Sequence, residues 1–136
     1  MDYNIIAVHW YPLATWDNFF KAAANSVAVG QHSGQVIGVD LLLNAFGQKP
    51  DQIHAIGHSL GGHLVGHFGR TINEKGGQGL ISRVSSLDPA KPWFDLTNPS
   101  NMLSKNDAKL VDVMHTNSGF ILNVSLKLVY NYLWMI

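Results

Sequence analysis

The stretch IGHSLGGHLVG, from Ile56 to Gly66, constrains the fold of this chain more than any other part of it. A serine stands between two glycines, directly after the apolar run QIHAIG (52–57) and directly before a helix-like pattern over residues 60–72. This arrangement is typical of a sharp turn from a strand into a helix, in which the residue at the tip has a strained backbone. We expect Gly57 and Gly61 to be glycines because a Cβ atom at either position would collide with the turn.

The rest of the chain alternates between short strand-like runs and longer segments. Apolar and β-branched runs predict strands over residues 4–9, 83–87 and 109–115, in addition to 52–57. A stripe of apolar residues predicts a helix from Asp17 to Ala45, with Thr15 or Asp17 as its N-cap and a break where glycines gather near residues 30–34. Strands that alternate with helices predict an α/β fold with a mostly parallel sheet and flanking helices.

Composition excludes several classes of partner and site. The 136 residues suffice for one domain, and a formal net charge of zero without a basic face argues against nucleic acid. The chain has no cysteine, so it can form neither a disulfide nor a thiolate metal site. Because it has no run of eighteen apolar residues, we expect no transmembrane span. The N-terminus MDYNIIAVHW lacks a basic region and a cleavage site, so we expect no signal peptide.

The turn predicts nucleophilic catalysis by Ser59. Its hydroxyl would project at the carboxyl edge of the sheet, and the N–H of Leu60, at the start of the helix, would be the first oxyanion donor. Asp88 ends the next strand and should emerge at the same edge, where it could serve as the acid that orients a histidine base. Asp112, inside a strand, and Asp40, on a helix, are weaker alternatives.

Three histidines have alternative interpretations. His63 and His67 are spaced four residues apart on one helix face, as zinc ligands would be, but Leu64 stands where the metalloprotease motif has glutamate. We favour a pair of histidines that pack near the sheet, because no third ligand is evident. His115 could replace a missing base, although a structural role at the sheet rim is the favoured interpretation.

Four motifs in a fixed order carry a family resemblance: AVHWYPLA, IHAIGHSLGGHLVGHFGR, SSLDPAKPWF and DAKLVDVMHTNSG. Over about residues 4–119, the chain resembles the pancreatic-lipase-like α/β-hydrolases, especially their arthropod lipase and phospholipase A1 branch. The resemblance implies that Ser59 is the nucleophile and Asp88 the acid. It also implies glycerolipid ester substrates and an extracellular location, since the family is mostly secreted.

The chain also departs from this family. The pattern stops at about Gly119, so we expect a partial α/β-hydrolase domain over 1–119 and a divergent apolar tail over 120–136, whose alternating pattern predicts one long strand. The family's catalytic histidine comes later than the HTNSG segment, and no histidine follows His115. The strand and loop that carry the second oxyanion donor would precede residue 1, and in the family that strand lies between the equivalents of residues 4–9 and 52–57.

These departures predict a truncated member that lacks N-terminal strands and the C-terminal catalytic segment. Of the calcium ligands that some members have, only Asp107 is kept, so we expect no calcium and no other cofactor.

The most favoured function is therefore a carboxylic ester hydrolase, of the triacylglycerol lipase or phospholipase A1 type, that is inactive as this fragment. The alternative is a non-catalytic lipase-like protein that binds or stores lipid. A metal-dependent hydrolase that uses His63 and His67 is the least favoured. In each of the first two cases the expected partner is a lipid ester or a lipid interface.

Overall fold

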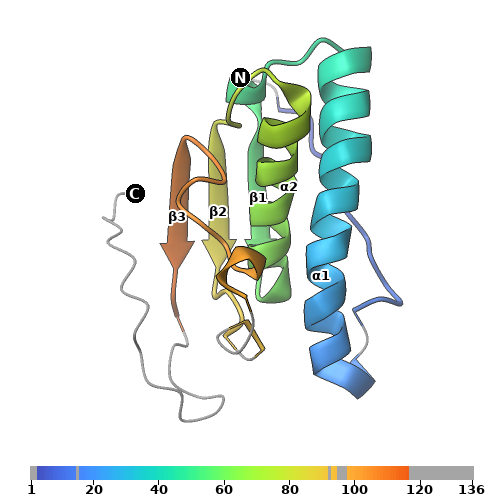
Figure 1. Ribbon diagram of the computed structural model, residues 1–136, viewed down its shortest axis with the longest axis vertical. Helices are drawn as coiled ribbons and strands as arrows, with labels where there is room; N and C mark the ends of the chain where they lie inside the picture. Colours follow the sequence, from blue (N-terminus) through green and yellow to red (C-terminus); the bar gives the residue numbers. More distant parts are fainter. Residues whose placement is uncertain (1–2, 15, 92, 95–97, 117–136) are drawn as a thin grey trace.

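Three short strands form a parallel sheet, which confirms the expected α/β class. The computed structural model describes residues 3–14, 16–91, 93–94 and 98–116. The strands are β1 (His54–His58), β2 (Arg83–Leu87) and β3 (Leu110–Met114), in the order β1-β2-β3. All three end together, because His58 pairs with Leu87 and Leu87 with Met114 (Figure 1). The predicted tail strand lies outside the described residues.

Two long helical segments cover one face of this sheet. α2 (Leu60–Gly76) packs on β1 and β2, and α1 (Phe19–Ser33) packs on α2. A π-helical segment, η2 (Gly34–Ala45), continues α1 without interruption, so the expected break is not present (Figure 1). The N-cap of α1 is Asn18, whose side-chain oxygen accepts a hydrogen bond from the Lys21 N–H at 2.9 Å, and not Asp17 as expected. Thr15 lies outside the described residues.

The glycines in the middle of this long helix are packing positions. A Cβ atom on Gly30 would lie 2.4 Å from the Leu64 carbonyl oxygen, and one on Gly34 would lie 2.7 Å from the Thr71 Cβ. Gly38, four residues further along, is as close to α2. The spacing of four residues places these glycines on one face, so the two helix backbones approach closely. The gain in contact offsets the conformational cost of glycine, which explains why the helix does not break.

The end of α2 also differs from the expectation. The predicted helical pattern ends at Ile72, but the helix extends four residues further, to Gly76. It ends where Gly77 adopts a left-handed conformation with φ 64°, as is common after a helix.

Residues 3–10 do not form the strand that the sequence predicts. They have no regular secondary structure, and Ile5 is 89% exposed. The physical reason is that a strand exists only by pairing, and no strand lies against this segment in the described part of the chain. A cavity of about 1160 Å³ instead separates the segment from the outer edge of β1. This is where the family resemblance places a further strand.

The sheet face opposite α2 is uncovered by any helix of the described residues. Strand alternation directs His54, Ile56 and His58 to this face, and Ile56 is 59% exposed. The face also carries a polar cluster, in which the Arg83 guanidinium binds the Asp112 carboxylate at 2.7 Å. Asp112, one of the alternative acids, is therefore already paired. Among the described residues, none of the helices combines the length and the apolar character that crossing a bilayer requires.

Candidate active site

Ser59 occupies the strained tip of the turn between β1 and α2. Its backbone has φ 55° and ψ −118°, a region that normally favours glycine. The backbone N–H of Ser59 donates to the Leu87 carbonyl oxygen at 2.9 Å, and the Ser59 carbonyl accepts from the Gly62 and Ala90 N–H groups at 3.0 and 3.2 Å. These three hydrogen bonds hold a serine in a conformation that it would not adopt in a free chain.

Of the two glycines of the motif, only Gly57 is required by close contacts. A Cβ atom on Gly57 would lie 2.0 Å from the carbonyl oxygen of Gly61, an overlap that would displace the first turn of α2. At Gly61, no atom lies within 4 Å of the Cβ position, so the expected collision there was wrong. It is the next residue, Gly62, that cannot accept a side chain, because its Cβ would lie 2.2 Å from the Ser86 Oγ.

Asp88 reaches the same edge of the sheet as Ser59. The two residues directly follow the last register pair of β1 and β2, His58 and Leu87. The Asp88 N–H donates to the Met114 carbonyl oxygen at 2.7 Å, and its φ of 43° turns the chain away from the sheet. Its carboxylate accepts hydrogen bonds from the backbone N–H and the hydroxyl of Thr116. The structure thus brings the serine and the carboxylate together at one edge, while their catalytic roles stay predictions.

Leu60 is the first residue of α2, so its N–H has no acceptor within the helix. The dipole of the 17-residue helix places partial positive charge at this end. An oxygen that acquires negative charge beside Ser59 would therefore be stabilised there. The observed geometry is compatible with the predicted oxyanion donor, and its role in catalysis stays a prediction.

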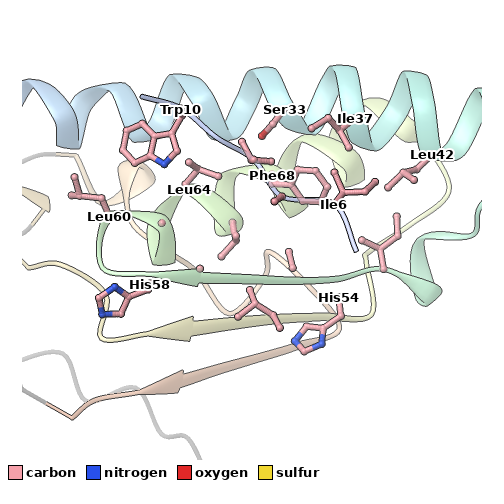
Figure 2. A pocket seen from close by; sticks show the side chains of 18 of the residues that line it. Ile6, Trp10, Ser33, Ile37, Leu42, His54, His58, Leu60, Leu64 and Phe68 are labelled. Carbon is pink, nitrogen blue, oxygen red and sulfur yellow. The ribbon is translucent and has the colours of Figure 1, made fainter. Parts of the chain in front are cut away.

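The 1160 Å³ cavity extends from this site along β1. Ser59 and Leu60 belong to its lining, and Figure 2 shows the other lining side chains continuing from Leu60 at one end to Leu42 at the other. The apolar side chains Ile6, Trp10 and Ile37 face it from the N-terminal segment and the long helix. The cavity lies between the N-terminal segment and β1, and the described part of the chain places no strand between these two.

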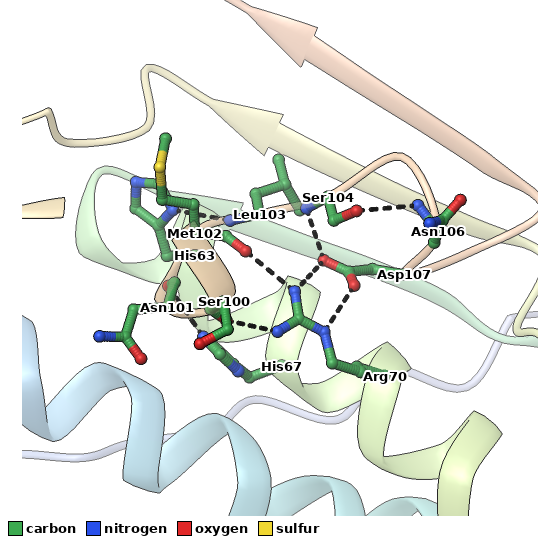
Figure 3. A network of polar contacts seen from close by, with 10 residues as sticks. All are labelled: His63, His67, Arg70, Ser100, Asn101, Met102, Leu103, Ser104, Asn106 and Asp107. Atoms are coloured by element: carbon green, nitrogen blue, oxygen red, sulfur yellow. Dashed lines mark hydrogen bonds and ion pairs between the residues drawn. The ribbon is translucent and has the colours of Figure 1, made fainter. Parts of the chain in front are cut away.

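His63 and His67 anchor a loop instead of forming a metal pair. The His63 Nε2 lies 2.8 Å from the Ala90 carbonyl oxygen, and the His67 Nε2 lies 2.9 Å from the Asn101 carbonyl oxygen. Burial lowers the pKa of both imidazoles, that of His63 to about 4. The favoured packing interpretation holds, but the contacts are with the loop after β2 and not with the sheet (Figure 3).

The same loop is bound by a partly buried ion pair that the sequence did not predict. The Arg70 guanidinium binds both carboxylate oxygens of Asp107, at 2.9 and 3.2 Å, and also donates to the carbonyls of Ser100 and Met102 (Figure 3). The Ser104 N–H donates to the same carboxylate at 2.7 Å. Asp107 is 1% exposed, so its carboxylate is held out of solvent and paired with a cation of the same chain. No sequence signal connects residues 37 positions apart in this way.

Two further glycines of α2 support this loop. Gly66 and Gly69 both face the segment around Asp107. A Cβ on Gly66 would lie 2.7 Å from the Asp107 carboxylate, and one on Gly69 would lie 2.3 Å from its carbonyl oxygen. Small residues at these positions let the loop lie directly on the helix backbone.

Other predicted residues have less part in the site. His115 is exposed and lies between Met114 and Thr116, the two residues that bind Asp88. Asp40 accepts a hydrogen bond from Gln35 on the long helix, outside the edge where Ser59 lies. Among the described residues, no group of three or more potential metal ligands converges.

Comparison with known proteins gives consistent matches. The family model described as Lipase matches residues 1–129. The pancreatic triacylglycerol lipase of Homo sapiens is 39% identical over 116 residues, which cover 85% of this chain and 23% of that protein. Pancreatic lipase-related protein 2 of Cavia porcellus is 36% identical over 88% of this chain and 26% of its own length. A putative endothelial lipase of Crotalus adamanteus is 35% identical over 90% of this chain and 23% of its own length. The chain spans about a quarter of the length of these curated relatives.

Proposed function

This chain belongs to the lipase family, and on that premise we propose that its protein is a carboxylic ester hydrolase with Ser59 as the nucleophile. The observation that carries the proposal is the strained backbone of Ser59, φ 55° and ψ −118°, at a strand-to-helix turn one strand away from Asp88. Strain of this kind costs about 1–3 kcal/mol and persists only where the surrounding structure holds it. A purely structural turn has no need of a serine there.

In the proposed reaction, the Ser59 Oγ attacks the ester carbonyl carbon while its proton passes to a histidine base. The former carbonyl oxygen becomes an oxyanion and accepts a hydrogen bond from the Leu60 N–H. When the intermediate collapses, the ester C–O bond breaks and the alcohol leaves with the proton from the histidine. Water then hydrolyses the acyl-serine by the same route, and Asp88 keeps the imidazole oriented throughout.

The base of this reaction is not among the residues that we assign. His115 is the last histidine of the sequence, and the family resemblance does not align it with the base. Loss of the base costs about six powers of ten in kcat where it has been measured in a serine protease. We therefore propose that this chain alone forms an acyl-serine slowly and turns over esters negligibly.

We further propose a glycerolipid ester as the substrate class, of the triacylglycerol or the phospholipid type, and an extracellular site of action. The support is the family membership, together with the similarity to the pancreatic triacylglycerol lipase of Homo sapiens. Comparison of release of fatty acid from triolein and from phosphatidylcholine emulsions, by the full-length protein, would distinguish the two substrate types.

The nucleophile is tested with a fluorophosphonate probe, which phosphonylates an activated serine with loss of fluoride. We expect the full-length protein, in which a histidine base can activate the serine, to form an adduct at Ser59, identified by peptide mass spectrometry, and its Ser59→Ala variant to form none under the same conditions. Equal labelling of both proteins, or none in either after prolonged incubation, would refute the nucleophile and favour a lipase-like protein that only binds lipid.

A further inference from the structure

The backbone of Ala90 connects the turn at Ser59 with the helix residue His63. Its N–H donates to the Ser59 carbonyl oxygen at 3.2 Å, and its carbonyl oxygen lies 2.8 Å from the His63 Nε2. Ala90 is also only two residues beyond Asp88, with Pro89 between them. Ala90 thus belongs to the loop that carries the acid, and it contacts both the turn that carries the nucleophile and the helix that follows this turn.

The partners of His63 determine its hydrogen-bonding state. The Leu103 N–H can only donate, and it lies 3.1 Å from the His63 Nδ1, so this nitrogen is the acceptor. In the neutral imidazole the proton is then on Nε2, which donates to Ala90. The ring is 5% exposed and stacks on Phe94, with centroids 3.7 Å apart and planes 20° apart. Ring position and tautomer are therefore both fixed.

From these contacts we propose that His63 is a positioning residue: through Ala90, it holds the acid-bearing loop at a fixed place relative to the nucleophile turn. The proposal rests on the proposed function in assigning Ser59 and Asp88 as reacting groups. His63 begins this chain of contacts from the first turns of α2, the helix that starts at Leu60. A shift of that helix and a shift of the loop are thereby coupled.

Two substitutions separate the two hydrogen bonds of His63. In His63→Gln, the amide nitrogen can occupy the place of Nε2 and keep the bond to Ala90, while the bond from Leu103 is lost. In His63→Asn, the side chain is shorter, and its amide oxygen can occupy the place of Nδ1. This variant keeps the bond from Leu103 and loses the bond to Ala90. Both variants remove the ring that stacks on Phe94, so each is the control of the other for packing.

The first readout is hydrogen exchange of the Ala90 amide, measured by NMR and compared with amides in the middle of α2 that report global opening. In His63→Asn, we expect the protection factor of the Ala90 amide to fall about tenfold more than the change in global opening explains. In His63→Gln, we expect this protection factor to be kept. Equal local loss in both variants would overturn the proposal, since it would mean that His63 acts by packing alone. So would unchanged Ala90 protection in His63→Asn.

The second readout is the rate of fluorophosphonate labelling at Ser59, measured in the full-length protein so that the base is present. We expect it to fall about tenfold or more in His63→Asn and to be retained in His63→Gln. Labelling at equal rates in the two variants would overturn the positioning role. Absence of labelling in the full-length wild-type protein would instead overturn the proposed function, and the Ala90 exchange rates would still decide whether His63 holds the loop.

A third measurement needs no variant and applies even if His63→Asn fails to fold. Nitrogen-15 chemical shifts of the imidazole in the wild-type chain at pH 7 should show a bare Nδ1 and a protonated Nε2. The opposite tautomer would exclude the hydrogen bond from Nε2 to Ala90 and overturn the proposal.

Discussion

Acidification should destabilise this chain through the buried imidazole of His63. Burial lowers its pKa from 6.5 to about 4, because the charged form would lose its hydration. A histidine with a lowered pKa binds its proton more weakly in the folded chain than in the unfolded one. The stabilisation is therefore complete above the unfolded pKa, is lost progressively as the pH falls from 6.5 toward 4, and changes little below that.

The size of this effect follows from linkage. One pKa unit corresponds to about 1.4 kcal/mol, so the lowering at His63 predicts a loss of about 3 kcal/mol between pH 7 and pH 4. Burial also lowers the pKa of His67, one helical turn away, and adds to the loss. Burial raises the pKa of Asp107, in spite of Arg70, and that carboxyl group opposes part of the loss.

The matched control is His63→Gln, which removes the titrating ring and leaves His67 and Asp107 in place. Urea unfolding followed by far-UV circular dichroism, at several pH values between 7.5 and 4, gives the free energy of unfolding of both chains. The difference between wild type and variant should shrink by about 3 kcal/mol toward acid pH. Parallel curves for the two chains would refute the reasoning, as would a difference that grows on acidification.

The remaining predictions concern the turn and its surroundings. Gly57→Ala should lower the free energy of unfolding by about 3 kcal/mol or more, because a carbonyl oxygen occupies the Cβ position. The matched change Gly61→Ala should cost less than about 1 kcal/mol, so equal melting temperatures for the two variants would contradict the account of the turn. Gly34→Ala should cost about 2 kcal/mol by forcing the two helices apart, measured by urea unfolding. Ser86→Ala should gain about 1 kcal/mol in the same assay, since its fully buried hydroxyl has no hydrogen-bond partner among the described residues. His115→Ala should label with fluorophosphonate at the wild-type rate, and a large loss would make His115 a candidate base.

The sequence predicts the centre of this fold well because its signals there are local. The strand over 83–87 is found at the predicted residues, and the turn at Ser59 begins a helix where expected. In these segments the apolar pattern and the turn residues agree with the tertiary contacts that they make. The same agreement places Asp88 at the edge beside the serine, since parallel strands in register end together.

The errors arise where structure depends on partners that are distant in sequence. Residues 4–9 have the composition of a buried strand, but a strand needs a neighbour to bond with. Gly34 suggests a helix break when it is considered alone, and only the approach of α2 gives it a packing role. The pairing of Arg70 with Asp107 has no local signal, because the end of α2, the strand β2 and a long loop separate the two.

The strain at the site is maintained by a repeated arrangement of neighbouring strands. Ser59 and Asp88 both have positive φ, and each donates its N–H to the carbonyl of the last residue on the next strand, Leu87 and Met114 respectively. Each unfavourable conformation is thus fixed by the strand beside it, so a slip of register by one residue would release both. The loop after Asp88 cannot use the sheet in this way, and polar side chains of α2 hold it instead. Backbone pairing therefore sets the serine and the carboxylate in place, while polar side chains of α2 set the loop that follows the carboxylate.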